Sequence, residues 1–260
     1  FELVVPTRRA YAEVPVTHAE DVVGDAAEVA ELLGDGAHLV GHSSGGLVAL
    51  LAAAQRPDAV RSLVVAEPPA FSVAEHEPAV GRLRAALEPL FAEPMGDRAF
   101  LEEFLRTVGT PVDTLPTPLL EELEHLVPAI RRGTAMWDVA VPVDALAAAP
   151  FRTVVVSGGH HQAFTTICEQ LAQAVQGEHV VLPGAGHEIQ EAPGFTDLLR
   201  HVWAGDRSPA PACSACRASP PACECAAPGG TSRPSADLRR ALPGPRGLTP
   251  PLTARRSPLR

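Results

Sequence analysis

Short runs of β-branched residues alternate with longer helix-like stretches over residues 1–204. The strand-like runs lie at 3–5, 37–41, 60–66, 152–156 and 179–182, and the helix-like stretches lie at about 22–33, 44–55, 163–175 and 194–203. Strands that are separated by helices pair in parallel, because the chain must cross back over the sheet before the next strand begins. The sequence therefore predicts an α/β fold with a mostly parallel sheet that is flanked by helices.

The first of these helices has the clearest boundaries. Thr17 followed by Glu20 matches a capping box, in which two side chains satisfy free amide groups at the start of a helix. The apolar positions that fall near one face of this helix are Val22, Ala26, Val29 and Leu33. Gly34 and Gly36 follow the last of them and are expected to end the helix.

Residues 71–149 interrupt the alternation. Prolines at positions 78, 89, 94, 111, 116, 118, 128 and 142 separate amphipathic helical pieces, of which 98–108 is one. Proline ends or kinks the interior of a helix, so short helices are expected here. We interpret the segment as a helical cap that is inserted between two strands of a single domain, residues 1–204.

The composition changes again after residue 204. Residues 205–260 are rich in Pro, Ala, Ser and Arg and show no periodic pattern that could bury a core, so we predict a disordered tail. The tail also holds most of the cysteines, namely Cys213, Cys216, Cys223 and Cys225. Their irregular spacing is not typical of a zinc site, and we expect neither a metal nor a cofactor.

Charge and hydropathy narrow the class of partner. The chain carries 31 acidic against 21 basic residues, whereas a nucleic-acid binder needs a basic face. It has no apolar run long enough to span a membrane, and its start lacks the layout of a secretory signal. Cys168 alone lies in the body, so no disulfide framework is expected there. We predict a cytoplasmic protein with a small-molecule substrate, and the pattern leaves its oligomeric state open.

The segment Gly41-His42-Ser43-Ser44-Gly45 matches G-x-S-x-G and stands between a predicted strand and a predicted helix. A sharp turn from strand to helix forces the serine into a strained backbone conformation and presents its hydroxyl at the edge of the sheet. The flanking glycines let the neighbouring backbone pass closely. We predict that Ser43 is a nucleophile and that the N–H of Ser44, at the positive end of the helix, stabilises an oxyanion.

A serine hydroxyl needs a base to become a nucleophile at neutral pH. His187 follows the last predicted strand in the loop Pro183-Gly184-Ala185-Gly186-His187, where it can reach over the edge of the sheet. The order of serine before histidine also fits this motif. His42, beside the serine, is better explained as a packing residue.

The third group should be a carboxylate that orients the base. After the strand at 153–157 the chain reads Gly158-Gly159-His160-His161, without an acid. Glu67, however, ends the strand-like run that neighbours the nucleophile strand, at the edge where sites in parallel sheets are built. Glu67 is therefore the predicted acid, and a neutral or water-mediated partner from His160 or His161 is the alternative.

The segments GHSSGG, RPDAVRSLVVAEPPA, TVVVSGG and LPGAGH resemble, in this order, the α/β-hydrolase fold family, in particular serine hydrolases of the esterase kind with a cap after the sixth strand. The resemblance covers about residues 1–204. It implies that residues 1–15 match the fourth strand and the loop after it, so that the third strand, which supplies a second oxyanion donor, would lie before Phe1. By this comparison the chain is truncated at its N-terminus. Most members place the acid after the seventh strand, and Glu67 matches a minority that place it after the sixth.

These features predict a hydrolase that acts on a small ester, thioester or amide through an acyl-enzyme, with Ser43, His187 and Glu67 as its triad. A serine at the elbow argues against haloalkane dehalogenases and epoxide hydrolases, which need a carboxylate nucleophile there. Cofactor-free perhydrolysis or C–C bond hydrolysis by the same residues is an alternative. The other alternative is a non-catalytic binding protein with this fold.

Overall fold

A computed structural model describes residues 2–13, 15–184, 186–205 and 253–258, and it describes the side chains of all but the last of these ranges. The predicted parallel sheet is present. Its strands are β2 (Ala37–His42), β3 (Val60–Ala66), β4 (Arg152–Ser157) and β5 (Glu178–Val181), hydrogen-bonded in that order and all parallel. The fold class is therefore α/β, as the alternation of strand-like and helix-like runs predicts.

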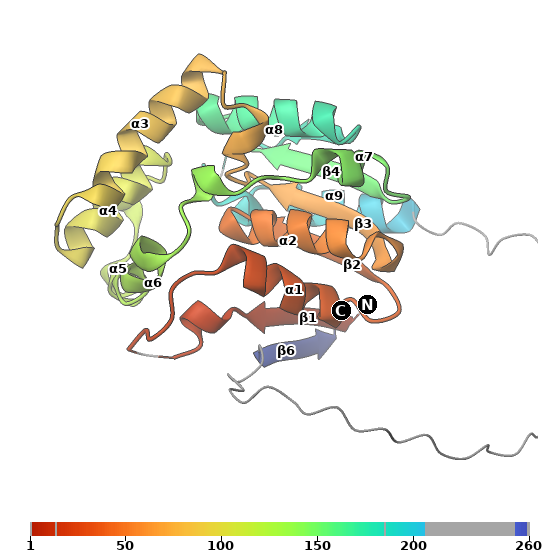
Figure 1. Cartoon of the computed structure of the whole chain (residues 1–260), viewed down its shortest axis with the longest axis horizontal. Helices are drawn as coiled ribbons and strands as arrows, with labels where there is room; N and C mark the ends of the chain where they lie inside the picture. The colour runs from red at the N-terminus through yellow and green to blue at the C-terminus, as the bar shows by residue number, and fades with distance from the viewer. Residues whose placement is uncertain (1, 14, 185, 206–252, 259–260) are drawn as a thin grey trace, which may run out of the picture. The chain divides into compact units, whose positions relative to one another are not determined.

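Helices cover both faces of this sheet. The body helices are α1 (Val22–Leu32), α2 (Ser44–Gln55), α8 (Gln162–Ala174) and α9 (Phe195–Gly205). Successive side chains of a strand point to opposite faces. Accordingly Leu63 and Val65 of β3 pack in the large cluster with α1, α2 and α8, whereas Val64 packs with α9. Figure 1 shows α2 in front of the sheet and α9 behind it.

All regular elements between β3 and β4 are helical. They are α3 (Pro78–Ala92), α4 (Asp97–Thr107), α5 (Thr117–Glu124), α6 (Val127–Arg132) and α7 (Val143–Ala147), and short 3-10 turns occur at Phe71–Val73, Val112–Thr114 and Met136–Asp138. Aromatic side chains pack edge to face among them, with Phe91 5.2 Å from Phe100 and 5.4 Å from Trp137 between ring centroids. Figure 1 shows α3 to α6 gathered at one side of the sheet. These elements fall within residues 71–149, which we call the helical cap segment.

The first strand, β1 (Glu2–Thr7), is longer than the predicted run at 3–5 and lies outside the four-stranded sheet. It pairs antiparallel with β6 (Thr253–Pro258). Six residues of the segment predicted as a tail thus form a strand that pairs with β1. Residues 206–252, with the four cysteines, lie outside the described part of the chain.

The predicted capping box of α1 is not formed. Asp21 is the N-cap instead, and its side chain accepts a hydrogen bond of 2.9 Å from the Gly24 N–H. Thr17 bonds to Glu13, and the carboxylate of Glu20 is held by Arg8. The prediction of a capping box was wrong because Asp21 is itself a strong N-cap residue and Glu20 has a cationic partner that is distant in sequence.

Further 3-10 turns lie at Arg9–Tyr11, Pro57–Ala59 and Ile189–Glu191.

Candidate active site

Ser43 is the single residue between β2 and α2. Its backbone has φ 51° and ψ −128°, which is a strained conformation for a residue with a side chain. Its N–H donates to the carbonyl of Ala66 at 2.9 Å, so the turn is tied to the end of β3. A Cβ on Gly41 would lie 2.4 Å from the carbonyl oxygen of Gly45, which explains why the turn needs glycine there. The strand–serine–helix turn that the motif predicts is therefore present.

Glu67 stands at the equivalent position after β3. Its φ is also positive, 43°, and its N–H donates to the carbonyl of Val156 at 2.9 Å. The side chain is 0% exposed. One carboxylate oxygen, Oε1, accepts a hydrogen bond of 2.7 Å from the N–H of Gly158, the first residue after β4. The carboxyl ends of β2, β3 and β4 thus meet at one edge of the sheet, as predicted.

His187 connects the other two predicted residues. Its Nδ1 donates to Oε2 of Glu67 at 2.7 Å, and its Nε2 lies 3.0 Å from Oγ of Ser43. Because Nδ1 carries the proton that bonds to the carboxylate, Nε2 is the acceptor and the Ser43 hydroxyl donates to it. The structure brings Ser43, His187 and Glu67 into one hydrogen-bonded chain.

The ring of His187 is held from two further sides. His42 Nε2 donates to the His187 carbonyl at 2.7 Å, and the two rings lie 4.9 Å apart. The Phe164 ring of α8 lies 4.7 Å from the His187 ring. Burial, followed by the charge of His187, lowers the pKa of His42, so His42 is kept neutral. His42 packs at the elbow as predicted, and it also fixes the loop that carries His187.

The carboxylate of Glu67 is stabilised in its charged form. Burial raises its pKa, but the hydrogen bonds from His160, His187 and the Gly158 N–H outweigh burial and lower the pKa to about 2. Glu67 is therefore ionised at neutral pH. An ionised acid can stabilise the imidazolium that forms when His187 accepts a proton.

Ser44 is the first residue of α2, so its N–H lies among the amides that have no acceptor within the helix. Its hydroxyl accepts a hydrogen bond of 2.9 Å from Arg8. Arg8 is itself paired with Glu20 at 2.5 Å and with Asp25 at 2.7 Å. This network ties the segment after β1 to the start of α2, and the sequence did not predict it because the partners of Arg8 are distant in the chain.

His160 and His161 occupy different places. His160 Nδ1 lies 3.4 Å from Oε1 of Glu67, so His160 adds to the predicted acid instead of replacing it. The His161 ring lies 6.1 Å from that of His160, on the side of α8. Sequence reasoning named both residues as possible partners of the base, and only the structure separates them.

Glu67, His160 and His187 are also the residues that could hold a metal ion. Each offers one ligand atom, and these atoms lie within 4.8 Å of one another. A metal on Nδ1 of His187 would replace its proton and the 2.7 Å hydrogen bond to Glu67. The hydrogen bonds between these groups fit the proton-transfer chain better than they fit a metal centre.

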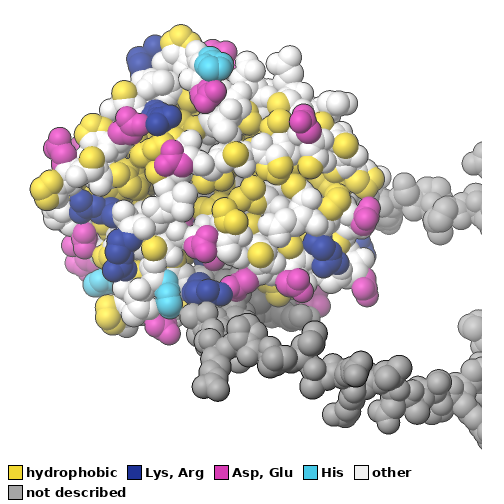
Figure 2. Space-filling view, in the orientation of Figure 1, with side chains coloured by type: hydrophobic (Ala, Val, Ile, Leu, Met, Phe, Trp, Pro, Cys, Tyr) yellow, Lys and Arg dark blue, Asp and Glu magenta, His cyan; other side chains and the backbone are white. Residues whose placement is uncertain are grey.

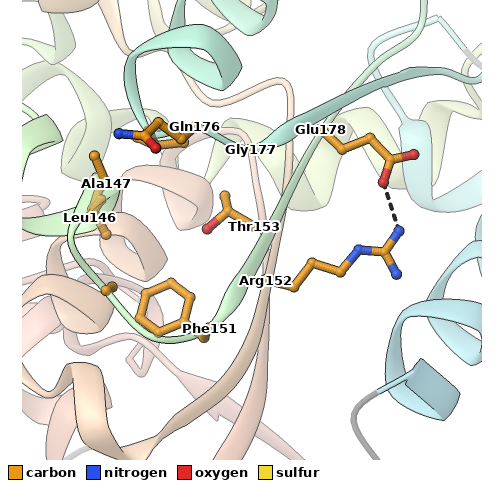
Figure 3. A pocket seen from close by; sticks show the side chains of 10 residues that line it. Leu146, Ala147, Phe151, Arg152, Thr153, Gln176, Gly177 and Glu178 are labelled. Carbon is orange, nitrogen blue, oxygen red and sulfur yellow. Dashed lines mark hydrogen bonds and ion pairs between the residues drawn. The ribbon is translucent and has the colours of Figure 1, made fainter.

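Open hollows border the described part of the body. One, of about 410 Å³, lies at the amino ends of β4 and β5, and Figure 3 shows the Arg152–Glu178 ion pair of 2.6 Å at its rim. Sites in parallel sheets form at the opposite, carboxyl ends of the strands, so this hollow is not the candidate site. Another, of about 370 Å³, lies between α3 and the start of α8 and includes His161. Its other lining residues are Ala79, Arg82, Leu83, Ala86, Thr107, Gln162 and Ala163.

A family model described as "Alpha/beta hydrolase family" matches residues 1–198, which include all three members of the hydrogen-bonded chain. The chain belongs to the alpha/beta hydrolase family. A search of curated proteins found none that matches it.

Solved structures of other alpha/beta hydrolases share the fold. A thermophilic esterase from Thermogutta terrifontis is 22% identical with a TM-score of 0.55, and the match covers 77% of this chain and 78% of that one. Naproxen esterase from Bacillus subtilis is 17% identical with a TM-score of 0.53, covering 75% and 70%. MenH from S. aureus is 14% identical with a TM-score of 0.54, covering 76% and 80%. At these identities the likeness extends to the fold.

The surface and the helices bear on the class of partner. Among the described residues, no helix combines the length and apolar character that crossing a membrane requires. On the face drawn in Figure 2, arginines lie singly among acidic side chains and apolar groups. This face therefore does not form a basic surface of the kind that binds phosphates.

Proposed function

We propose that this alpha/beta hydrolase cleaves small esters, thioesters or amides through an acyl-enzyme on Ser43. The observation that carries the proposal is the pair of hydrogen bonds in series, 3.0 Å from Ser43 Oγ to His187 Nε2 and 2.7 Å from His187 Nδ1 to Glu67. Nucleophile, base and acid in this order have the geometry that serine acyl transfer requires.

The steps follow from these contacts. Ser43 Oγ attacks the carbonyl carbon while its proton passes to His187 Nε2, and the carbonyl oxygen becomes an oxyanion near the Ser44 N–H. The bond to the leaving group then breaks as His187 returns the proton to the departing oxygen, sulfur or nitrogen. Water attacks the acyl group with His187 as base, the acid product leaves, and Ser43 recovers its proton. Glu67 stays ionised and stabilises the imidazolium in both halves.

The hollow of about 370 Å³ beside His161 has the size of a small-ligand site, and its lining does not include Ser43, Glu67 or His187. Alanine and leucine side chains of α3 line this hollow. Its polar lining includes Arg82, whose guanidinium donates to Oε1 of Gln162 at 3.4 Å. A cavity of a few hundred Å³ suits a small organic ligand.

The proposal is tested with a fluorophosphonate probe, which reacts with activated serines. We expect stoichiometric labelling that maps to Ser43 by peptide mass spectrometry and is lost in Ser43→Ala, whose circular dichroism and melting should match the parent protein. A folded parent protein that does not react would contradict the proposal and favour a non-catalytic binding protein. Labelling that persists in Ser43→Ala would place the nucleophile elsewhere.

A further inference from the structure

Glu67 carries a second imidazole in addition to His187. His160 Nδ1 lies 3.4 Å from Oε1 of Glu67, the oxygen that also accepts the Gly158 N–H. The other nitrogen of the same ring, Nε2, lies 3.3 Å from the carbonyl oxygen of Val108. Val108 directly follows α4 in the helical cap segment, so one ring joins the buried acid to the cap.

Both partners of His160 are hydrogen-bond acceptors. A neutral imidazole has one N–H and can satisfy only one of them, whereas an imidazolium has two and satisfies both. The hydrogen bond to Glu67 raises the pKa of His160, and it prevails over burial, which lowers it. Geometry and electrostatics therefore agree on a cationic ring.

The backbone at Gly109 and Gly158 passes close to the His160 ring. Gly109 has φ 87°, and a Cβ there would lie 2.7 Å from Cδ2 of His160. A Cβ on Gly158 would lie 2.9 Å from Nδ1 of His160. The Phe164 ring stacks on the other side at 6.5 Å with an interplanar angle of 20°. Two glycines and one aromatic ring thus fix where His160 can point.

The charge of His160 also acts on the base. The groups that face it are the Glu67 carboxylate, the His187 ring at 6.3 Å and the His161 ring at 6.1 Å between centroids. A cation at this distance opposes protonation of His187, while its hydrogen bond shares the negative charge of Glu67.

We propose that His160 is a positioning residue that, as an imidazolium, bridges Glu67 to the carbonyl of Val108 in the helical cap segment and opposes protonation of the base His187. The hydrogen bonds that link Ser43, His187 and Glu67 need neither the contact of His160 with Glu67 nor its contact with Val108. The role of His160 is therefore additional to the triad. The proposal rests on the function proposed above for that triad.

Two neutral variants separate the contacts of the ring. The side-chain amide of His160→Asn matches the position of Nδ1 and keeps a donor to Glu67, whereas that of His160→Gln matches Nε2 and keeps a donor to Val108. The matched control is His125→Asn, which replaces an exposed histidine that directly follows α5 in the helical cap segment. The readout is the pH dependence of kcat/KM and kcat for a p-nitrophenyl ester.

In both His160 variants, loss of the cation should move the acid limb of the kcat/KM profile to higher pH by about one pH unit, because His187 then binds a proton more readily. A limb displaced by that amount lowers the fraction of neutral His187 about tenfold on the acid side of the limb, so we expect kcat/KM there to fall about tenfold, with little change on the alkaline side. His125→Asn should leave the limb in place. An equal loss of kcat/KM at every pH with an unmoved limb would overturn the proposal.

A measurement without turnover separates this proposal from the proposed function. Nitrogen-15 NMR of the imidazole of His160 in the full chain should show two protonated nitrogens at pH 7, with the signal assigned by its loss in His160→Gln. A neutral tautomer at pH 7 would overturn the proposal even if the fluorophosphonate probe labels Ser43. Failure of labelling with an imidazolium at residue 160 would instead count against the proposed function alone.

Discussion

Replacing Glu67 by Gln changes one buried atom and tests the whole hydrogen-bonded chain. In the parent protein the Gly158 N–H donates to Oε1 of Glu67 at 2.7 Å. The amide oxygen of Gln at position 67 can still accept this hydrogen bond. The amide nitrogen then faces Nδ1 of His187 and must donate to it. His187 is forced into the tautomer with its proton on Nε2, which points at Ser43 and can no longer accept the hydroxyl proton.

The size of the effect follows from this change of tautomer. In a Ser-His-acid triad, conversion of the acid to its amide lowers kcat by about 10⁴-fold. That factor corresponds to about 5 kcal/mol of lost transition-state stabilisation. KM should change little, because Glu67 is 0% exposed and does not face the substrate. The fold should persist at pH 7 with a lowered free energy of unfolding, because Gln has the same shape as Glu but lacks the charge that the surrounding hydrogen bonds stabilise.

The assay is steady-state hydrolysis of p-nitrophenyl acetate at pH 7, with melting of each variant followed by circular dichroism. Glu178→Gln is the matched control, because Glu178 is exposed, pairs with Arg152 at 2.6 Å and lies at the start of β5. The control should retain the parent kcat. A loss of less than tenfold in a folded Glu67→Gln would refute Glu67 as the acid that orients His187.

Two further predictions concern stability. Gly41→Ala places a Cβ 2.4 Å from the carbonyl oxygen of Gly45 and should lower the free energy of unfolding by about 1–3 kcal/mol. At Gly81 in α3 a Cβ meets open space, so Gly81→Ala should raise the free energy of unfolding by up to about 1 kcal/mol. Equal urea midpoints of the two variants would contradict the close packing around Gly41. Acid should also weaken the fold through Glu67, whose folded pKa of about 2 lies below its unfolded value of 4.5. This contribution is complete above the unfolded pKa and is lost as pH falls toward the folded one, so from pH 6 to pH 3 the parent protein should lose about 2 kcal/mol more than Glu67→Gln in urea unfolding. Parallel losses would show that Glu67 carries no such stabilisation.

Much of the site followed from the sequence because the decisive signals are local. A G-x-S-x-G between a strand and a helix implies a strained serine, and Ser43 has φ 51°. Glu67 could be named because the ends of neighbouring parallel strands meet at one edge. His187 could be named because a glycine loop after the last strand leads to the same edge. Each inference depends on residues that are close in the chain.

Contacts between distant segments could not be read in this way. Thr17 does not cap α1, since Asp21 does so and Arg8 takes Glu20. The pairing of β1 with β6 joins segments at opposite ends of the chain. A local sequence pattern cannot show which of several suitable residues or strands will pair. Their positions in the folded protein decide that.

The sequence by itself determined the α/β architecture, the strained turn at Ser43 and the choice of His187 as the proposed base. These depend on periodicity and on the conformational limits of a few neighbouring residues. The tertiary structure alone decided that Glu67 is shared by His187 and His160 and that His161, the next residue, is not a partner. The difference between the two adjacent histidines arises from the direction in which the chain leaves β4, which brings one ring to the buried carboxylate and turns the other toward α3.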